Sequence, residues 1–322
     1  MKWFWALPLL AIASVSGCDP GGSSDQSDGI TLGVVMSTFS SPYNSAIVRE
    51  FKRYTEEQGY QLVMLDSMLD IQREAYNIDN LISKRVDAIL VNAVDSKGSR
   101  AALRKAAQAG YMVLCFNATV DAASELGVRA YTGPKYYDQG AMAAKVVLQQ
   151  LQEQSHAVMI TGTPGYSAAN DRETGFLDTI QQEKALLTML DIQTANWMRE
   201  DAQRIMSDFI TKYDDEIDVV YIHDDNMAAG AVNAFKAAGY TLDNKPLIVS
   251  IGAMADGLPL IQQGWLDSSI MQSPLEDCQL AIETAVAIMA GQQTESFQNY
   301  FMQTPPVDQS NVAEVIALDM WR

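Results

Sequence analysis

The residue pattern closest to an enzymatic motif in this chain is Gly165-Tyr166-Ser167-Ala168-Ala169. A serine on a tight turn between a strand and a helix can act as a nucleophile, but such a turn carries a further glycine where Ala169 stands. The chain has two histidines that could serve as its base, His156 and His223. His156 comes directly before a predicted strand, which is a poor position for a catalytic histidine. The sequence therefore predicts that the protein is not an enzyme.

Three adjacent residues, His223, Asp224 and Asp225, are of types that bind metal ions. Neighbouring residues at the end of a strand point in different directions, so these three are unsuited to holding one ion. No glycine-rich phosphate loop of the Walker type occurs in the chain. We therefore expect neither a metal nor a cofactor.

Cys18 ends the run Val15-Ser16-Gly17-Cys18, which matches the lipobox cleaved by the bacterial lipoprotein signal peptidase. The apolar stretch 3–13 before it is too short to span a bilayer, and Lys2 gives the positive start of an export signal. Residues 1–17 are therefore predicted to be a signal peptide, and Cys18 to carry the lipid. The alternative is an ordinary signal peptide with a chance cysteine at its cleavage site.

Residues 18–29 are rich in Gly, Ser and Asp and contain no aliphatic side chain before Ile30, which predicts a flexible tether. Asp19 resembles the signal that retains lipoproteins of enteric bacteria at the inner membrane. We therefore expect a periplasmic protein anchored by its lipid at the inner membrane face. The lipid is the only contact with the membrane that we expect.

The composition limits the partners of the remaining chain. Its 322 residues are enough for two domains, and its net charge of −18 gives a surface that repels nucleic acid and anionic lipid. We therefore expect that the protein does not bind nucleic acid. We also expect it to be a monomer. Cys115 and Cys278 would lie in an oxidising compartment, where they could form a disulfide or remain two buried free thiols.

The elements that must position any site form two successive series of alternating strands and helices. The first series predicts strands at 30–36, 61–65, 88–91 and 112–116, with helices at 43–59, 71–84 and 99–109. The second predicts strands at 157–161, 187–193, 219–222, 247–251 and 267–271, with helices at 139–152, 168–182, 201–212, 227–238 and 275–290. Such alternation predicts an α/β fold of two doubly wound parallel-sheet lobes, with a ligand cleft at the carboxyl ends of the strands.

Several fragments carry a family resemblance over nearly the whole chain after the tether. They include Val35 to Tyr43 (VMSTFSSPY), Gly59 to Ser67 (GYQLVMLDS), Ile89 to Asn92 (ILVN), Ser167 to Phe176 (SAANDRETGF) and His223 to Ala231 (HDDNMAAGA). In this order they resemble the periplasmic sugar-binding proteins of the ribose-binding type. That family has the type I periplasmic binding protein fold, which also forms the effector domain of LacI-type repressors. A repressor is excluded here by the export signal and the acidic charge.

The resemblance implies that the chain crosses between the lobes three times, near 131–134, 272–274 and 300–306. One lobe would comprise residues 30–132 plus 273–300, and the other residues 133–272 plus 301–322. A hinge rotation would close the lobes on the ligand. The implied function is capture of a small sugar or polyol for an ABC permease. The alternative is a receptor that presents its closed form to a membrane sensor kinase or chemoreceptor.

The resemblance also implies the ligand contacts, which suit hydroxyl groups and the C–H face of a sugar ring. They are Ser37, Ser41, Tyr43, Asn92, Asn117, Arg172, Trp197, Asp224 and Gln272. Five of them also have a plain structural interpretation. The two asparagines could be turn residues, the two aromatics could be packing residues, and Arg172 could form a surface ion pair with Asp171 or Glu173.

The chain departs from the family pattern at three places. Gly252-Ala253 stands where relatives have an aspartate turn, Ala118 replaces an arginine, and Asn44 replaces a common aromatic. The chain thereby lacks an aspartate that could accept two hydrogen bonds and an arginine that could donate two. The ligand is therefore not expected to be ribose itself. Asp224 could replace the lost acceptor, paired with Arg172.

Overall fold

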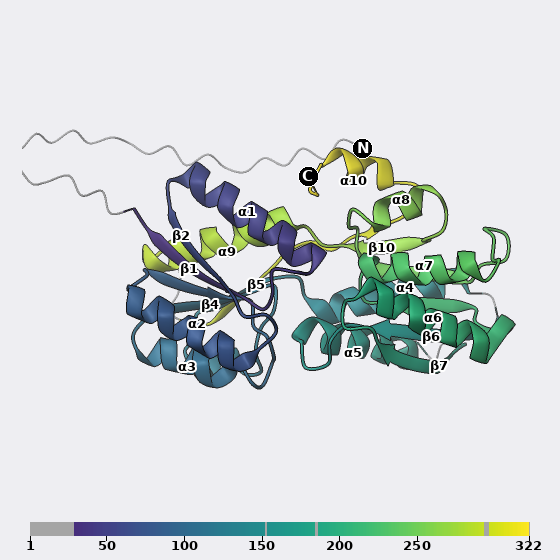
Figure 1. The fold of residues 1–322 in the computed structure, drawn as a ribbon, viewed down its shortest axis with the longest axis horizontal. Coiled ribbons are helices and arrows are strands. Elements are labelled where there is room, and N and C mark those ends of the chain that lie inside the picture. Colours follow the sequence, from purple (N-terminus) through teal and green to yellow (C-terminus); the bar gives the residue numbers. More distant parts are fainter. Residues whose placement is uncertain (1–28, 152, 184–185, 293–295, 322) are drawn as a thin grey trace, which may run out of the picture.

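The structure is a computed structural model that describes residues 29–151, 153–183, 186–292 and 296–321. Two lobes lie side by side, each built on a six-stranded sheet with helices on both faces (Figure 1). The predicted signal peptide, Cys18 and all of the predicted tether except Gly29 lie outside the described residues. Within the described ranges, no helix combines the length and apolarity needed to cross a membrane.

The sheet of the N-terminal lobe has the strand order β11-β5-β4-β3-β1-β2, and its neighbouring strands are all parallel. Its strands are β1 (Thr31–Met36), β2 (Gln61–Asp66), β3 (Ala88–Val91), β4 (Met112–Phe116), β5 (Ala130–Gly133) and β11 (Gln298–Phe301). Its helices are α1 (Pro42–Gln58), α2 (Ile71–Lys84), α3 (Arg100–Gln108) and α9 (Pro274–Met289). Alternate residues of β1 face opposite cores: Leu32 and Val34 pack with α1 and α9, whereas Val35 packs with α2 and α3.

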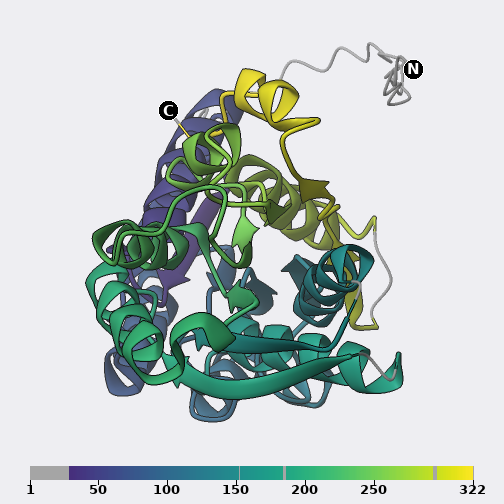
Figure 2. The ribbon, with the colours of Figure 1, turned by 90° about the vertical axis from the view of Figure 1, so that its right-hand side faces the viewer.

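The sheet of the C-terminal lobe has the order β12-β10-β9-β8-β6-β7, in which the pairing of β12 with β10 is antiparallel. Its strands are β6 (Ser155–Thr161), β7 (Leu187–Thr194), β8 (Val219–Ile222), β9 (Leu247–Gly252), β10 (Ser268–Met271) and β12 (Pro306–Val307). Its helices are α4 (Tyr136–Gln150), α5 (Ser167–Gln182), α6 (Arg199–Tyr213), α7 (Asp225–Ala237), α8 (Gly257–Gln262) and α10 (Val312–Ala317). Helices α4 and α5 cover one face, and α6 and α7 the other (Figure 2).

The chain passes between the two sheets three times. The passages are at residues 134–135 between β5 and α4, 272–273 between β10 and α9, and 302–305 between β11 and β12. The predicted fold class of two doubly wound lobes joined by three crossings is confirmed. In both sheets the strand order reverses next to the first strand of the lobe, at β1/β3 and at β6/β8, which is where ligands of such sheets bind.

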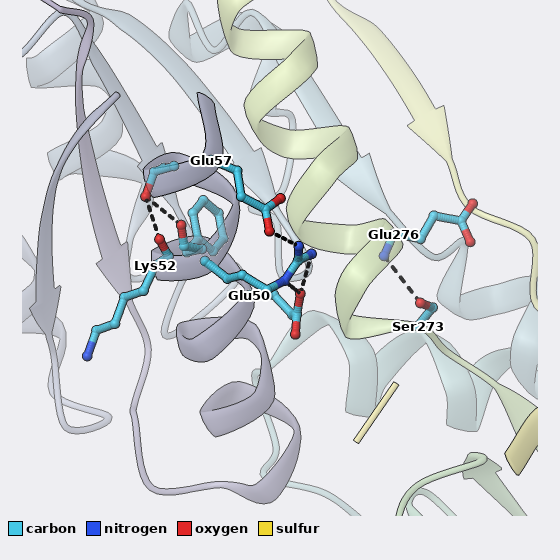
Figure 3. A network of polar contacts seen from close by, with 8 residues as sticks. Glu50, Lys52, Glu57, Ser273 and Glu276 are labelled. Atoms are coloured by element: carbon cyan, nitrogen blue, oxygen red, sulfur yellow. Dashed lines mark hydrogen bonds and ion pairs between the residues drawn. The ribbon is translucent and has the colours of Figure 1, made fainter. Parts of the chain in front are cut away.

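Local capping explains where two helices that start near the cleft, α1 and α9, begin. The Ser41 hydroxyl accepts a hydrogen bond from the Asn44 amide (3.2 Å), and Pro42 occupies the first helical position of α1. Ser273 caps α9 in the same way, accepting from the Glu276 amide (3.2 Å; Figure 3). These caps fix the direction in which each helix leaves the cleft.

Figure 3 also shows an ion-pair cluster on α1, close to α9. Arg53 contacts Glu50 (2.8 Å) and Glu57 (2.6 Å), three and four residues away on the same helix. Such exposed pairs contribute only about 0.3–0.5 kcal/mol each. The packing of α1 on α9 therefore depends on the buried residues beneath, including Ile47, Phe51 and the apolar face of α9.

Close packing of α4 on α5 depends on two glycines. A Cβ atom at Gly140 would lie 2.1 Å from the carbonyl oxygen of Arg172, and one at Gly175 would lie 2.0 Å from that of Tyr137. No side chain fits at such distances from backbone, so the two helices can approach only because both residues are glycine. This contact also fixes the position of Arg172 relative to α4.

Candidate ligand-binding site

A cavity lies between the lobes at the carboxyl ends of the strands. The empty space in it is about 560 Å³, counting the space open to solvent at its mouth. Eight of the nine residues predicted as ligand contacts line it: Ser37, Ser41, Tyr43, Asn117, Arg172, Trp197, Asp224 and Gln272. These side chains therefore surround one space, although they come from both lobes and from a crossing.

Asn92, the ninth predicted residue, lies directly behind the lining. It is fully buried, and its side-chain oxygen accepts from the Ser37 amide (3.3 Å) and the Tyr166 hydroxyl (3.2 Å). Asn92 therefore supports two lining residues from opposite lobes. Its position at the carboxyl end of β3, the switch point of the first sheet, accounts for this role.

Arg172 is the central polar residue of the cleft and is 5% exposed. Its Nε and Nη2 donate to the Gln139 side-chain oxygen (3.0 and 2.9 Å), and Nη2 donates to that of Gln272 (2.7 Å). Its Nη1 donates to the carbonyl of His223 (2.6 Å). Four of the five N–H groups of the guanidinium are thus used within the protein, and one on Nη1 is left.

The expected pairing of Arg172 with Asp224 is not made. Asp224 instead caps α7, with one carboxylate oxygen accepting from the Met227 amide (2.7 Å). A side chain that caps its own helix is held at the helix start, and Arg172 turns toward Gln139 and Gln272. Burial raises the pKa of Asp224 to about 7.

Asn117 and Gln272 join the two lobes through a second network. The side-chain oxygen of Asn117 accepts from Gln272 Nε2 (3.0 Å) and from the Tyr136 hydroxyl (2.5 Å). Asn117 Nδ2 in turn donates to the Tyr166 hydroxyl (3.4 Å). Asn117 has φ +53°, in the left-handed region that asparagine tolerates better than most residues. The cleft floor is therefore one connected set of amides and phenols.

Trp197 forms an aromatic wall of the cavity. Its ring lies so close to Gly162 that a Cβ there would be 2.0 Å from the ring, and it meets the Tyr166 ring edge-on at 5.9 Å. The backbone of Trp197 has φ +65°, a strained conformation for a bulky residue. Asn226 Nδ2 holds it by donating to the Trp197 carbonyl (2.9 Å). Strain maintained in this way is typical of functional sites.

The side chains considered as catalytic or metal-binding candidates do not come together in one site. His223 Nδ1 accepts from the Gly162 amide (3.3 Å), and burial keeps the pKa of His223 well below its usual value. The Asp225 carboxylate points the other way, accepting from the Ser269 hydroxyl (2.7 Å). His156 lies at the start of β6, the opposite end of the strand from the turn that holds Ser167.

Direct hydrogen bonds join the lobes across the cleft. The Ser96 amide donates to the Gly165 carbonyl (2.9 Å), and the Thr119 amide donates to the Ser167 hydroxyl (3.2 Å). The structure is therefore a closed arrangement of the two lobes.

Trp321, near the C-terminus, also touches both lobes, which the sequence reasoning missed. Its Nε1 donates to the Ala253 carbonyl (2.8 Å), and its ring lies 6.0 Å from that of Tyr43. Nine lining residues were not among the predicted contacts either: Thr38, Asn44, Leu69, Tyr136, Tyr166, Ala168, Ile251, Gly252 and Met254. Of these, Thr38 and Ala168 belong to fragments already quoted, so the resemblance could have pointed to them.

Cys115 and Cys278 are both free and buried, so they are two thiols and not a disulfide in this structure. Burial raises the pKa of Cys115 to about 12, which keeps the thiol protonated and unreactive.

A buried carboxyl beside the cavity leads to a pH prediction. Asp277 on α9 accepts from the Tyr43 hydroxyl (3.1 Å) through Oδ2, its Oδ1 has no partner, and burial raises its pKa to about 8. A carboxyl whose pKa is higher in the folded than in the unfolded state destabilises the fold as pH rises from about 4 to about 8. Asp277→Asn is therefore expected to stabilise the chain at pH 8 and change little at pH 4.

Urea unfolding at pH 4, 6 and 8 measures this effect as the difference between variant and wild type. Asp208→Asn, at an exposed position on α6, is the matched control and is expected to give no such pH-dependent difference. A difference between Asp277→Asn and wild type that does not change with pH would contradict the prediction.

Comparisons with known proteins agree with this geometry. A family model described as periplasmic binding protein domain matches residues 32–293. The ribose import binding protein RbsB of Bacillus subtilis (strain 168) is 26% identical over 277 residues, covering 86% of this chain and 87% of that protein. The xylitol-binding protein of Mycolicibacterium smegmatis is 26% identical over 302 residues, covering 92% and 82%. A solved structure from Mycobacterium smegmatis in complex with β-D-fucofuranose has TM-score 0.83 at 25% identity, covering 91% and 96%.

Proposed function

We propose that this chain, which belongs to the periplasmic binding protein domain family, captures a small sugar or polyol between its lobes and delivers it to an ABC transporter. The family consists of periplasmic solute-binding proteins that are not enzymes, which accords with the dispersed positions of Ser167 and the two histidines. The named relatives bind ribose and xylitol, and both names support a polyhydroxy ligand.

The observation that carries the proposal is that three kinds of group line one cavity: an aromatic ring, a hydrogen-bond donor that is still free, and a carboxyl oxygen that can accept a hydrogen bond. Trp197 offers a flat face for the C–H side of a ring, Arg172 has one N–H left, and Asp224 has one oxygen outside its helix cap. Neighbouring hydroxyls of a sugar or polyol need a donor and an acceptor side by side. This combination suits a neutral polyhydroxy compound better than an anion, because Arg172 is the one cationic side chain among the lining residues and most of its N–H groups are already used within the protein.

We further propose that Cys18 carries the lipid, and that the tether holds a monomeric body at the periplasmic face of the inner membrane. The match of Val15 to Cys18 with a lipobox supports the lipid. The lobes would then divide at the three crossings, as residues 30–132 plus 273–300 and residues 133–272 plus 301–322. A tether of 12 residues would leave the cleft free to meet a membrane partner.

A thermal-shift panel tests the proposed ligand class. The soluble body, residues 19–322, is screened with pentoses, hexoses, deoxyhexoses, inositols and linear polyols. One class is expected to raise Tm by several degrees, because a ligand at 100 times its Kd stabilises the native state by about 2.7 kcal/mol. Amino acids and dicarboxylates serve as controls and are expected to give no shift. A panel in which only a control class raises Tm would overturn the proposal.

A further inference from the structure

We propose that the ligand is a 6-deoxy sugar, a polyhydroxy ring whose exocyclic carbon is a methyl group and not a hydroxymethyl group. This rests on the proposed function and goes beyond it by naming the class of sugar. It follows from three lining residues, Leu69, Ile251 and Met254, which we call the apolar wall. They line the cavity together with Trp197 and add aliphatic surface from both lobes.

Met254 occupies the turn where an aspartate acceptor is expected from the resemblance. Its side chain lies across Gly252, whose added Cβ would be 2.6 Å from Met254 Cγ. The backbone donors of this turn are occupied, since the Met254 amide donates to Asp225 (2.5 Å) and the Ala253 amide to the Ser269 hydroxyl (2.8 Å). The turn therefore presents a thioether chain to the cavity and offers a ligand hydroxyl no N–H at these two residues.

Leu69 brings apolar surface from the opposite lobe. It follows β2, its amide donates to the Ser37 carbonyl (2.7 Å), and its side chain lines the cavity while 46% of the residue remains exposed. Its φ of +59° is in the left-handed region, where a leucine is uncommon and an asparagine or glycine is favoured. Leu69 therefore adds a partly exposed aliphatic side chain to the cavity from the N-terminal lobe.

Several polar groups that line the cavity are already bonded within the protein. Asn117 and Gln272 bond each other, and Arg172 uses four N–H groups internally. Asn44 Nδ2 donates to Ser37 and to the Thr38 carbonyl. Each buried hydroxyl needs a donor or acceptor of its own, and one placed against the apolar wall would lose its water without a replacement. A methyl group at that position loses nothing.

Isothermal titration with matched sugar pairs tests the inference. The pairs are L-rhamnose and L-mannose, L-fucose and L-galactose, and D-fucose and D-galactose, each differing only in methyl against hydroxymethyl. In the pair that binds most tightly, the methyl sugar is expected to have a Kd about 10- to 100-fold lower. Leu69→Asn, which suits the left-handed backbone, is expected to reduce this ratio at least threefold. Leu242→Asn makes the same change at an exposed leucine that does not line the cavity, and it is expected to preserve the ratio.

The outcomes separate the two claims. If the hydroxymethyl member binds equally or better, or if a pentose or polyol binds more tightly than every 6-deoxy sugar, the inference is overturned while the proposed function stands. If Leu69→Asn keeps the full ratio, the apolar wall does not set the preference, and the inference fails at that step. If no sugar or polyol of any kind binds, the proposed function and the inference fail together.

Discussion

Arg172→Ala is expected to abolish the thermal shift produced by any ligand that stabilises the wild-type chain, with Kd raised at least 100-fold. The guanidinium supplies a donor to the cavity and holds Gln139 and Gln272 in place from two sides. Truncation removes that donor and leaves buried acceptors without partners, each at a cost of about 1–3 kcal/mol. The unliganded variant is therefore also expected to melt at a lower temperature than the wild type.

The substitution is expected to change the Tm of the unliganded protein as well. The ligand-induced change in Tm is therefore measured against the unliganded Tm of the same variant. Arg204→Ala removes an arginine from an exposed position on α6 and is expected to leave the shift intact. Arg172→Lys keeps the charge without the planar fork and is expected to recover little of the affinity. A folded Arg172→Ala variant that binds as tightly as wild type would show that the ligand does not contact this residue.

Gly175→Ala is expected to lower the stability of the C-terminal lobe sharply. An alanine in a helix interior normally stabilises by about 1 kcal/mol relative to glycine, so the sign of the change is informative. Here the added Cβ would lie 2.0 Å from the Tyr137 carbonyl oxygen, and α4 and α5 would have to separate. Overpacking of this kind costs about 1–3 kcal/mol or more, and it would displace Arg172 on the same helix.

Urea unfolding and ligand titration together measure that effect. Thr174→Ala is the matched control, because it changes the neighbouring exposed residue of α5 without adding bulk at the helix contact. The control is expected to unfold within about 0.5 kcal/mol of wild type. If Gly175→Ala is as stable as the control and binds ligand normally, the two helices are not packed as closely as described.

Much of the fold could be predicted because buried parallel strands and amphipathic helices have distinct periods. Strands β5, β11 and β12 were missed as strands, since they have only two to four residues and lie beside the crossings. Strand β5 (Ala130–Gly133) is followed by Pro134, which indicated a hinge. Its four residues were too few to give a recognisable strand pattern. Helix α10 has six residues and no clear apolar period, so nothing local predicted it.

The site residues could be predicted as a group because strand ends of both sheets meet at one cleft. The hydrogen-bond partners of these residues could not be predicted from the sequence. Arg172 and Gln272 are 100 residues apart, and their hydrogen bond depends on how a crossing places Gln272 beneath α5. The cap on α7 took Asp224 away from Arg172, and the contact of Trp321 with Tyr43 depends on the path of the C-terminal segment. Such contacts arise from tertiary geometry and leave no periodic signal.

A crystal structure of residues 19–322 with the compound that gives the largest thermal shift tests the central claim most directly. The ligand is predicted to lie between the two lobes, with the remaining Arg172 N–H and the Asp224 carboxylate on its hydroxyls and Trp197 against its C–H face. Density for the ligand outside the cleft, or on one lobe with Arg172 and Trp197 untouched, would contradict it.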